Sequence, residues 1–223
     1  AERDVKATKS FGPAYLLNSI GDEIQLRKKL SESFGKDGDL ILAIAMSKLL
    51  HQTSLKNMHH VLEDSFLPEM YSLKESFTSQ WLSDFLARLS SKDATMTSFY
   101  NSIIAGEDET LIFDITSFSS ASKNIDWLEW GYNRDGLDLP QVNLGLVLSL
   151  HRHLPLFFKL FPGSINDVVT LKNLVSDVKS FGIKKSLFIL DRGFYSENNI
   201  KELSDENIDF ILPLSFSVNI GKG

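Results

Sequence analysis

Two patterns of apolar residues divide the chain near residue 105. Before that point, apolar side chains recur every three or four positions, which predicts helices. Trp81, Phe85 and Leu89 share one such face, and a stripe of this kind is ordinary core packing. Asp22 is the expected cap of the second helix and Leu67-Pro68 the expected break after the fourth. The helices are expected at residues 13–20, 23–34, 39–50, 55–66, 79–89 and from 91 or 93 to 104.

After residue 105, short apolar runs alternate with turn residues, which predicts strands. Residues 127–132 carry further apolar and aromatic side chains, and 133–136 form a turn signal. Two helices are expected, one at 167–181 with Asn166 as its cap and Gly182 beyond its end, the other at 196–203 capped by Ser196. The strands are expected at 110–115, 141–150, 154–160, 186–190 and 208–212, with a hairpin turn at 151–153 between the second and third.

This order, three strands followed by alternating helix and strand, predicts one mixed sheet flanked by helices. The fold class is therefore α/β, and the order is typical of a ribonuclease H-like core. We expect a helical region over residues 1–105, in which nothing specifies chemistry, and the core over residues 106–223, incomplete at its C-terminal end.

Charge and composition narrow the class of protein. The chain has 223 residues, a formal net charge of −6 and no cysteine, which excludes disulfides and thiolate metal sites and favours an intracellular location. No basic tail or stripe indicates nucleic acid, although a core built around carboxylates is acidic locally. The longest apolar stretch, residues 40–50, is too short to span a bilayer. Because the chain has neither an initiator Met nor a terminal helix, we expect a fragment of a longer protein.

Two aspartates carry the candidate chemistry. Asp114 ends the apolar run 111–113 and Asp191 ends the run 187–190. In the predicted sheet, the first and fourth strands are neighbours, so the two carboxylates would lie side by side and repel each other unless a cation neutralises them. Oxygen ligands of this kind prefer Mg²⁺ or Mn²⁺ to zinc. The plainer alternative is that each aspartate caps the turn after its strand, and Asp191 before Arg192-Gly193 suits that role.

An ordered series of motifs resembles the DDE transposases of bacterial and archaeal insertion sequences, a group that cuts and pastes DNA. The resemblance covers nearly the whole chain, including Gly12 to Leu17 in the leading region. The segments are Phe113-Asp114-Ile115-Thr116, Gly131-Tyr132-Asn133-Arg134-Asp135-Gly136, Gln141-Val142-Asn143-Leu144-Gly145, Phe161-Pro162-Gly163-Ser164 and Leu190-Asp191-Arg192-Gly193-Phe194-Tyr195.

The resemblance implies that Asp114 and Asp191 are the first two catalytic, metal-holding carboxylates, in a site for two Mg²⁺ or Mn²⁺ ions. It also implies cleavage at the element's ends and attack of a 3′-hydroxyl on target DNA. The implied partners are the terminal repeats, the target DNA and further copies of the chain assembled on paired ends, with no membrane. The implied location is the cytoplasm of a prokaryote, at the nucleoid.

The third carboxylate of the family, a Glu within Tyr-x-x-Arg-x-x-x-Glu, has no match in this sequence. The acidic residues after Asp191 belong to the preceding helix and its turn, and they are Glu197, Glu202, Asp205, Glu206 and Asp209. Two alternatives therefore stay open. One is a truncated, inactive remnant that acts at most as a DNA-binding module, and the other is a metal-dependent nuclease on the same fold.

Four further residues are weaker candidates. Arg192 is placed to contact a phosphate, because guanidinium matches phosphate geometry, and Tyr195 to stack on a splayed base. A surface Arg and a packed Tyr are the plain alternatives. His151 and His153 have the i, i+2 spacing of a zinc pair on a strand, but no third ligand lies nearby in sequence.

Overall fold

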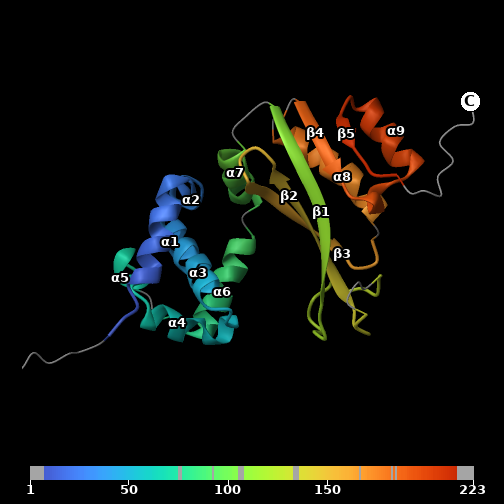
Figure 1. The fold of residues 1–223 in the computed structure, drawn as a ribbon. Coiled ribbons are helices and arrows are strands. Elements are labelled where there is room, and N and C mark those ends of the chain that lie inside the picture. The colour runs from blue at the N-terminus through green and yellow to red at the C-terminus, as the bar shows by residue number, and fades with distance from the viewer. Residues whose placement is uncertain are drawn as a thin grey trace, which may run out of the picture. The chain divides into compact units, whose positions relative to one another are not determined.

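The structure, a computed structural model, describes residues 8–74, 77–91, 93–104, 108–132, 136–165, 167–181, 183 and 185–214. The chain divides into two compact units, Ala1–Ile103 and Ile104–Gly223. The first is helical and the second is built on a sheet (Figure 1).

The helical unit packs its helices around one apolar core. Leu82 and Phe85 of α6 are buried in it, as the predicted stripe requires, and the rings of Trp81 and Phe85 stack. Among the described residues, no helix combines the length and the apolarity needed to cross a bilayer. The elements are α1 (Gly12–Glu23), α2 (Leu26–Phe34), η1 (Gly35–Asp37), α3 (Gly38–Leu50), η2 (Leu55–Asn57), α4 (Met58–Asp64), α5 (Leu67–Met70), α6 (Ser79–Ser90) and α7 (Asp93–Ile103).

Two predicted helix boundaries in this unit are wrong. Asp22 does not cap α2, because it lies inside α1, where its carboxylate accepts a hydrogen bond from Asn18 Nδ2. The residue before α2 is Gln25, which adopts the left-handed conformation at φ 55° and has no side-chain cap. The helix expected over 55–66 already ends at Asp64, and Leu67-Pro68 begins α5, since proline lacks only an N–H that the first turn leaves unpaired anyway.

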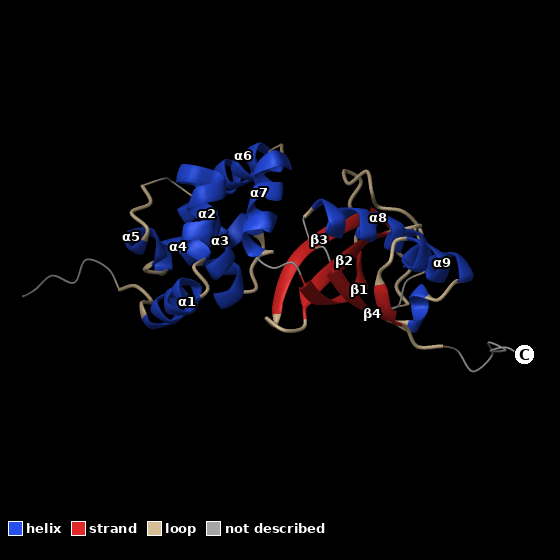
Figure 2. Ribbon diagram, turned by 90° about the horizontal axis from the view of Figure 1, so that it is seen from above, coloured by secondary structure: helices blue, strands red, loops and turns tan. Residues whose placement is uncertain are grey.

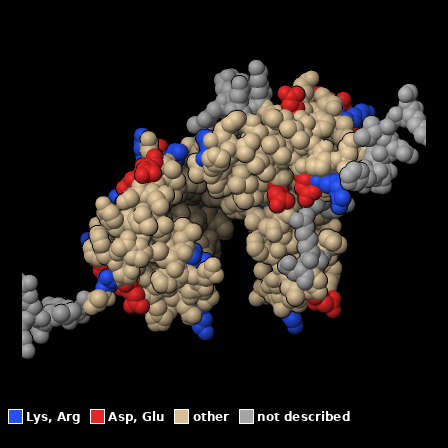
Figure 3. All heavy atoms as spheres, in the orientation of Figure 1, with Lys and Arg blue, Asp and Glu red and all other residues tan. Residues whose placement is uncertain are grey.

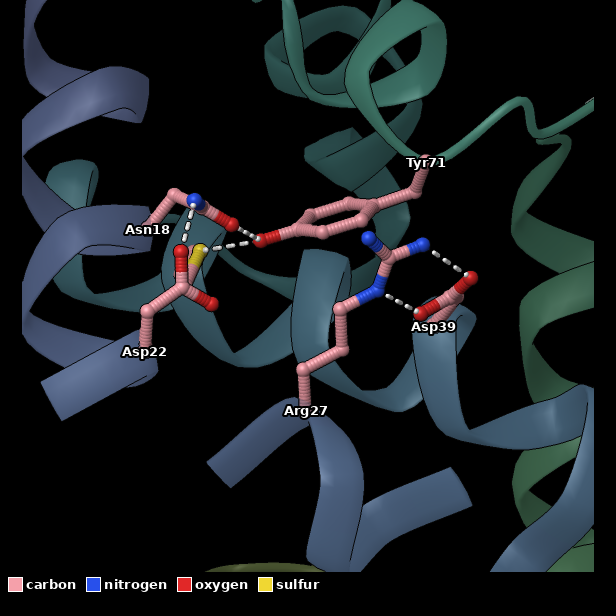
Figure 4. A network of polar contacts seen from close by, with 6 residues as sticks. Asn18, Asp22, Arg27, Asp39 and Tyr71 are labelled. Carbon is pink, nitrogen blue, oxygen red and sulfur yellow. Dashed lines mark hydrogen bonds and ion pairs between the residues drawn. The ribbon is translucent and has the colours of Figure 1, made fainter. Parts of the chain in front are cut away.

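A polar network joins α1, α2, α3 and the end of α5 (Figure 4). Arg27 donates two hydrogen bonds to Asp39, at 2.7 and 2.9 Å, and its guanidinium lies 5.0 Å from the ring centre of Tyr71. The Tyr71 hydroxyl donates to Asn18 Oδ1 at 2.8 Å. Bonding to Asp39 raises the pKa of Arg27, and burial raises the pKa of Tyr71 to about 12. These charges and hydroxyls are used to hold the unit together.

The second unit contains a five-stranded mixed sheet in the order β3-β2-β1-β4-β5. β1 pairs antiparallel with β2 and parallel with β4, β2 pairs antiparallel with β3, and β4 pairs parallel with β5. This confirms the α/β fold class and the ribonuclease H-like arrangement. The elements are β1 (Asp108–Ser119), β2 (Gln141–Ser149), β3 (Leu154–Pro162), α8 (Asp167–Ser180), β4 (Lys185–Leu190), η3 (Arg192–Phe194), α9 (Glu197–Asp205) and β5 (Asp209–Ile211).

The predicted elements of this unit differ from the structure mainly around β1. The mostly polar residues 116–119 continue the strand, because β2 pairs with them as far as Ser119. Residues 127–132 make one isolated bridge, Glu129 with Gln141. Ser196 caps α9 as predicted, since its hydroxyl accepts from the Asn199 amide. Asn166, Gly182 and three of the four predicted turn residues, 133–135, lie outside the described residues.

The described helices α8 and α9 cover one face of this sheet, which we call the helix face (Figure 2). The ring of Phe113 contacts Phe194 of η3, and Lys159 of β3 pairs with Asp177 of α8 at 2.7 Å. Side chains alternate along a strand, so the residues between these point to the opposite face. On that second face, Phe118, Phe158 and Ile211 are about half exposed, at 56%, 46% and 55%. We call it the open face.

Candidate active site

Asp114 lies on the open face, in the middle of the central strand. Its neighbours Phe113 and Ile115 are buried on the helix face, whereas Asp114 is exposed. The residue opposite it on β2 is Leu146. Oδ1 of Asp114 accepts a hydrogen bond from the Ile115 amide at 2.8 Å. The carboxylate therefore stands at the solvent surface on a backbone that two neighbouring strands hold.

Asp191 is the first residue after β4 and still has an extended backbone, with φ −72° and ψ 160°. Its carboxylate accepts a hydrogen bond from the Gly193 amide at 3.0 Å and so caps the short helix η3. The alternative interpretation, in which Asp191 caps the turn after its strand, is therefore correct. Because only one carboxylate oxygen is used in this way, the other is available for a ligand.

The register of β1 with β4 brings the two aspartates together. The last paired residues of these parallel strands are Phe113 and Leu190, both buried on the helix face. Asp114 and Asp191 each follow directly, and both are exposed. Neighbouring strands are about 4.8 Å apart. The register thus places the two aspartates next to each other on neighbouring strands, where the pairing of β1 with β4 stops, as the order of elements predicts.

No described residue neutralises this pair. Neither aspartate forms an ion pair with a described Lys, Arg or His, although like charges at neighbouring sheet positions destabilise a sheet. Two hard oxygen ligands fit a divalent ion such as Mg²⁺, which keeps several waters and needs few carboxylates. Within the described ranges, no group of three or more His, Asp or Glu side chains is placed to hold a metal.

Arg192 and Tyr195 lie beside Asp191 in chain order. Arg192 is exposed and begins η3, and it forms no ion pair with a described residue. Tyr195 is half-buried and ends the same turn, where its amide donates to the Arg192 carbonyl at 3.1 Å. Arg192 therefore has the freedom that a phosphate contact requires, whereas Tyr195 is partly packed. Their roles toward DNA stay predictions.

His151 and His153 are not spaced along a strand. Residues 151–153 form the turn between β2 and β3, and His153 has a left-handed backbone at φ 53°. The imidazole Nε2 of His151 lies 3.2 Å from the Thr110 hydroxyl. The geometric premise of a zinc pair, two side chains projecting alike from one strand, is therefore wrong.

Two buried amide side chains beside the C-terminal end of β1 were not predicted from the sequence. Gln141 and Asn143 are 2% and 5% exposed, and they follow each other on the helix face of β2. Gln141 Nε2 donates to the Tyr132 carbonyl at 3.0 Å, and Asn143 Nδ2 donates to the Ile165 carbonyl at 2.9 Å. Both amides also reach the Gly163 carbonyl, at 3.3 and 3.4 Å. Polar residues at i and i+2 in a buried strand were the available signal.

These amide side chains hold two loops against the first residues of β2. Glu129 and Gln141 exchange backbone hydrogen bonds of 3.1 and 2.9 Å, and the Glu129 carboxylate accepts from the Ser164 hydroxyl. A side chain at Gly131 would collide with the Gly163 carbonyl oxygen, so the two glycines allow the loops to touch. The loops at residues 127–132 and 163–165 are therefore fixed beyond the end of the β1–β4 pairing.

Charged residues are scattered over the face that Figure 3 presents, and Lys and Arg form no continuous patch there. This agrees with the net charge of −6.

The family of the chain follows from its sequence over the sheet unit. Residues 105–221 match the model of the transposase DDE domain family, which is more than half of the chain. The protein belongs to this family of DDE transposases. A comparison with curated proteins finds no significant match.

Solved structures of three transposases resemble the chain at low identity. A piggyBac transposase synaptic complex with hairpin DNA matches 82% of the chain at 13% identity and a TM-score of 0.47. A Mos1 transposase paired-end complex with the left transposon end matches 78% at 11% identity and 0.34. A Drosophila P element transposase strand transfer complex matches 87% at 18% and 0.32. The chain spans 43%, 59% and 43% of these proteins, roughly half of their length.

Proposed function

We propose that the protein is the DNA transposase of a prokaryotic insertion sequence, acting on the element's terminal repeats and on target DNA. One observation carries the proposal: the register Phe113 with Leu190 is followed on both strands by an exposed aspartate. The family supports the reaction class. The chain would act with further copies of itself on paired ends, in the cytoplasm at the nucleoid.

Asp114 and Asp191 would hold divalent ions, Mg²⁺ or Mn²⁺, through the carboxylate oxygens that project from the open face. Such ions, when bound as a pair, activate a water or a 3′-hydroxyl and stabilise the departing oxygen. The chain's own contribution is to hold the two carboxylates in fixed positions. Asp114 is fixed by two paired strands, and Asp191 by its bond to the Gly193 amide, so neither carboxylate needs to be ordered when the substrate arrives.

Arg192 would bind a phosphate oxygen beside this pair. It follows Asp191 directly, is exposed, and has a guanidinium that donates in the fork geometry that phosphates accept. Tyr195, three residues further on, would contact the neighbouring base or sugar. Both roles place DNA across the strand ends of the open face.

Metal binding tests the proposal directly. Calorimetric titration with Mn²⁺ is expected to give binding in the wild type and at least tenfold weaker binding in Asp114→Asn and in Asp191→Asn. Each variant keeps the Oδ1 acceptor, so the hydrogen bonds to Ile115 and Gly193 are retained. Asp205→Asn, at the exposed end of α9, is the matched control and should bind Mn²⁺ like the wild type. Equal binding by all four proteins would contradict the proposed metal site.

Two alternatives use the same fold. A nuclease would cleave DNA with Mn²⁺ but would not join a 3′-hydroxyl to target DNA, so an in vitro strand-joining assay separates it from a transposase. A non-catalytic module is favoured by one observation, the lack of a three-carboxylate cluster within the described ranges. If the chain binds Mn²⁺ but never nicks supercoiled plasmid, that second alternative is the better one.

A further inference from the structure

An apolar groove lies on the open face, on the same strand as Asp114. Phe118 is four residues beyond Asp114 on β1, about 13 Å at 3.3 Å per residue, and projects to the same side. The groove has a volume of about 460 Å³ and is lined mainly by apolar side chains. These are Phe118, Ile125, Trp127, Leu128, Val142 and Leu160.

The backbone that presents the groove's aromatic wall is firmly held. The Trp127 carbonyl accepts from the Gly163 amide at 3.4 Å, and the Leu128 amide donates to the Ile125 carbonyl at 3.1 Å. Next to them, Glu129 pairs with Gln141 through two backbone hydrogen bonds. The segment is thus fixed by backbone hydrogen bonds to Gln141 and Gly163, which do not involve its aromatic rings.

The rings themselves are left in solvent. Trp127, Trp130 and Tyr132 are 49%, 64% and 84% exposed, and Phe118 is 56% exposed. Large aromatic side chains gain most when they are buried, and a contiguous exposed apolar patch marks a binding surface. A rigid backbone with outward-facing rings is preorganised for a ligand, because little conformational entropy remains to be lost.

The size and place of the groove favour a flat aromatic ligand. Its volume is that of a small-ligand site, and its walls fall far short of the roughly 800 Å² that each partner contributes to a stable protein interface. It lies about 13 Å from Asp114 along β1, on the same face of the sheet, within reach of a DNA strand bound at the aspartates. Lys123 in the adjoining loop is exposed and forms no ion pair with a described residue, so it is available to a phosphate.

We propose that this groove binds an unpaired nucleobase of the DNA strand whose phosphate is held at Asp114 and Asp191. The inference rests on the proposed function for the position of that strand. Trp127 stacks on the base, and Phe118 and Leu160 close the other walls. Stacking of this kind is tolerant of sequence, since every base has an aromatic face.

Binding of short oligonucleotides tests the groove. The 223-residue chain is titrated with a fluorescently labelled thymidine 12-mer and with an abasic 12-mer of the same phosphate backbone, at low salt. Both carry the same charge, so only a base-binding site distinguishes them. We expect the thymidine 12-mer to bind about tenfold more tightly, the effect of one or two stacked bases. The intrinsic tryptophan fluorescence should fall with it.

Variants assign the effect to the groove. Trp127→Ala is expected to remove the preference for the thymidine 12-mer, and Trp127→Phe to keep most of it. Ile211→Ala, which truncates an equally exposed side chain of the open face on β5, is the matched control and should bind both oligomers like the wild type. Equal binding of the two oligomers by the wild type, or a preference that survives in Trp127→Ala, would overturn the proposal. So would a dimer in sedimentation that Trp127→Ala dissolves, because the groove would then hold another protein chain.

The two proposals fail separately. If Asp114→Asn loses Mn²⁺ binding while Trp127→Ala binds both oligomers like the wild type, the base site is wrong and the metal site stands. If Trp127→Ala loses the preference while Asp114→Asn binds Mn²⁺ normally, the groove binds bases and the proposed transposase site is wrong. Trp127→Ala itself should bind Mn²⁺ like the wild type.

Discussion

Two carboxylate sites, one in each unit, are built in opposite ways. In the helical unit, Asp39 receives two hydrogen bonds from Arg27, whose guanidinium also lies against the ring of Tyr71. In the sheet unit, Asp114 and Asp191 stand beside each other, and no described cation pairs with either. The first arrangement is complete within the chain. The charge of the second is neutralised only when a cation binds to it.

This difference separates structural from functional charge. A paired carboxylate between helices fixes how those helices pack, and its removal leaves a cation without its partner. Two like charges on adjacent strands repel each other at a cost to the folded chain, although each carboxylate also accepts one hydrogen bond from a backbone amide. Single aromatic rings show the same contrast, because Phe85 is buried in the helical core whereas Trp130 and Tyr132 project from a fixed loop into water.

The largest expected effect is the loss of unfolding free energy when one buried ring is removed from the core of each unit. Phe85→Ala and Phe113→Ala each remove a ring that is 1% exposed, and each should cost about 3–5 kcal/mol of unfolding free energy. If the units fold independently, Phe85→Ala lowers only the transition of the helical unit and Phe113→Ala only that of the sheet unit. Scanning calorimetry of the two variants checks this. A single transition shifted equally by both substitutions would mean that the units unfold together.

The second prediction concerns pH and the buried phenol of the helical network. Burial raises the folded pKa of Tyr71 to about 12 from an ordinary value near 10. The stability that the neutral phenol contributes is therefore fully present below pH 10 and is lost as the pH rises through 12. The loss is at most about 3 kcal/mol. Urea unfolding between pH 9 and 12 should show it in the wild type.

The variant Tyr71→Phe separates this effect from the general effect of alkali. It has no phenol to ionise, so its unfolding free energy should fall less steeply over the same pH range. Tyr15, which is 58% exposed, serves as the matched control, because Tyr15→Phe should leave the steep fall unchanged. Parallel curves for the wild type and Tyr71→Phe would show that the phenol is not buried as described.

The sequence predicted the positions of the two aspartates better than it predicted their surroundings. The order of elements and the ends of two apolar runs were enough to bring Asp114 beside Asp191, because the parallel pairing of β1 with β4 stops at Phe113 and Leu190, although β1 itself continues to Ser119. The mostly polar residues 116–119 could not be recognised as strand, since only β2 pairs with them and their outward side chains meet solvent. The role of Gln141 and Asn143 depends on carbonyl groups up to 22 residues away, which no local pattern reveals.

The helical unit shows the same limit. The stripe on α6 was predictable because helical spacing places its residues on one face. The turn at Gln25 was not, since a left-handed glutamine is set by how α1 and α2 pack and not by its own preference. Local propensity thus predicted the elements, and the long-range contacts decided where they end.

The third prediction removes one partner of the helical ion pair. Asp39→Asn should lower the unfolding free energy by about 1–2 kcal/mol, because the charge-assisted bonds from Arg27 are weakened and its guanidinium stays fixed against Tyr71. The side chains are 48% and 30% exposed, and solvent keeps the effect modest. Denaturant unfolding checks the value. Glu32→Gln, whose contact with Lys28 is 3.9 Å long and open to solvent, is the matched control and should change little.

The smallest effect has the opposite sign and is the sharpest test of the comparison. Asp114→Asn keeps the Oδ1 acceptor for the Ile115 amide but removes one of two adjacent negative charges. Without divalent ions, we expect the variant to be more stable than the wild type by about 0.5 kcal/mol, as for other like-charge pairs in sheets. Adding Mn²⁺ should then stabilise the wild type and not the variant, since only a ligand that binds the folded state shifts its stability. Were Asp114→Asn less stable than the wild type in the absence of metal, the carboxylate would be a structural partner like Asp39, and the contrast between the two units would be lost.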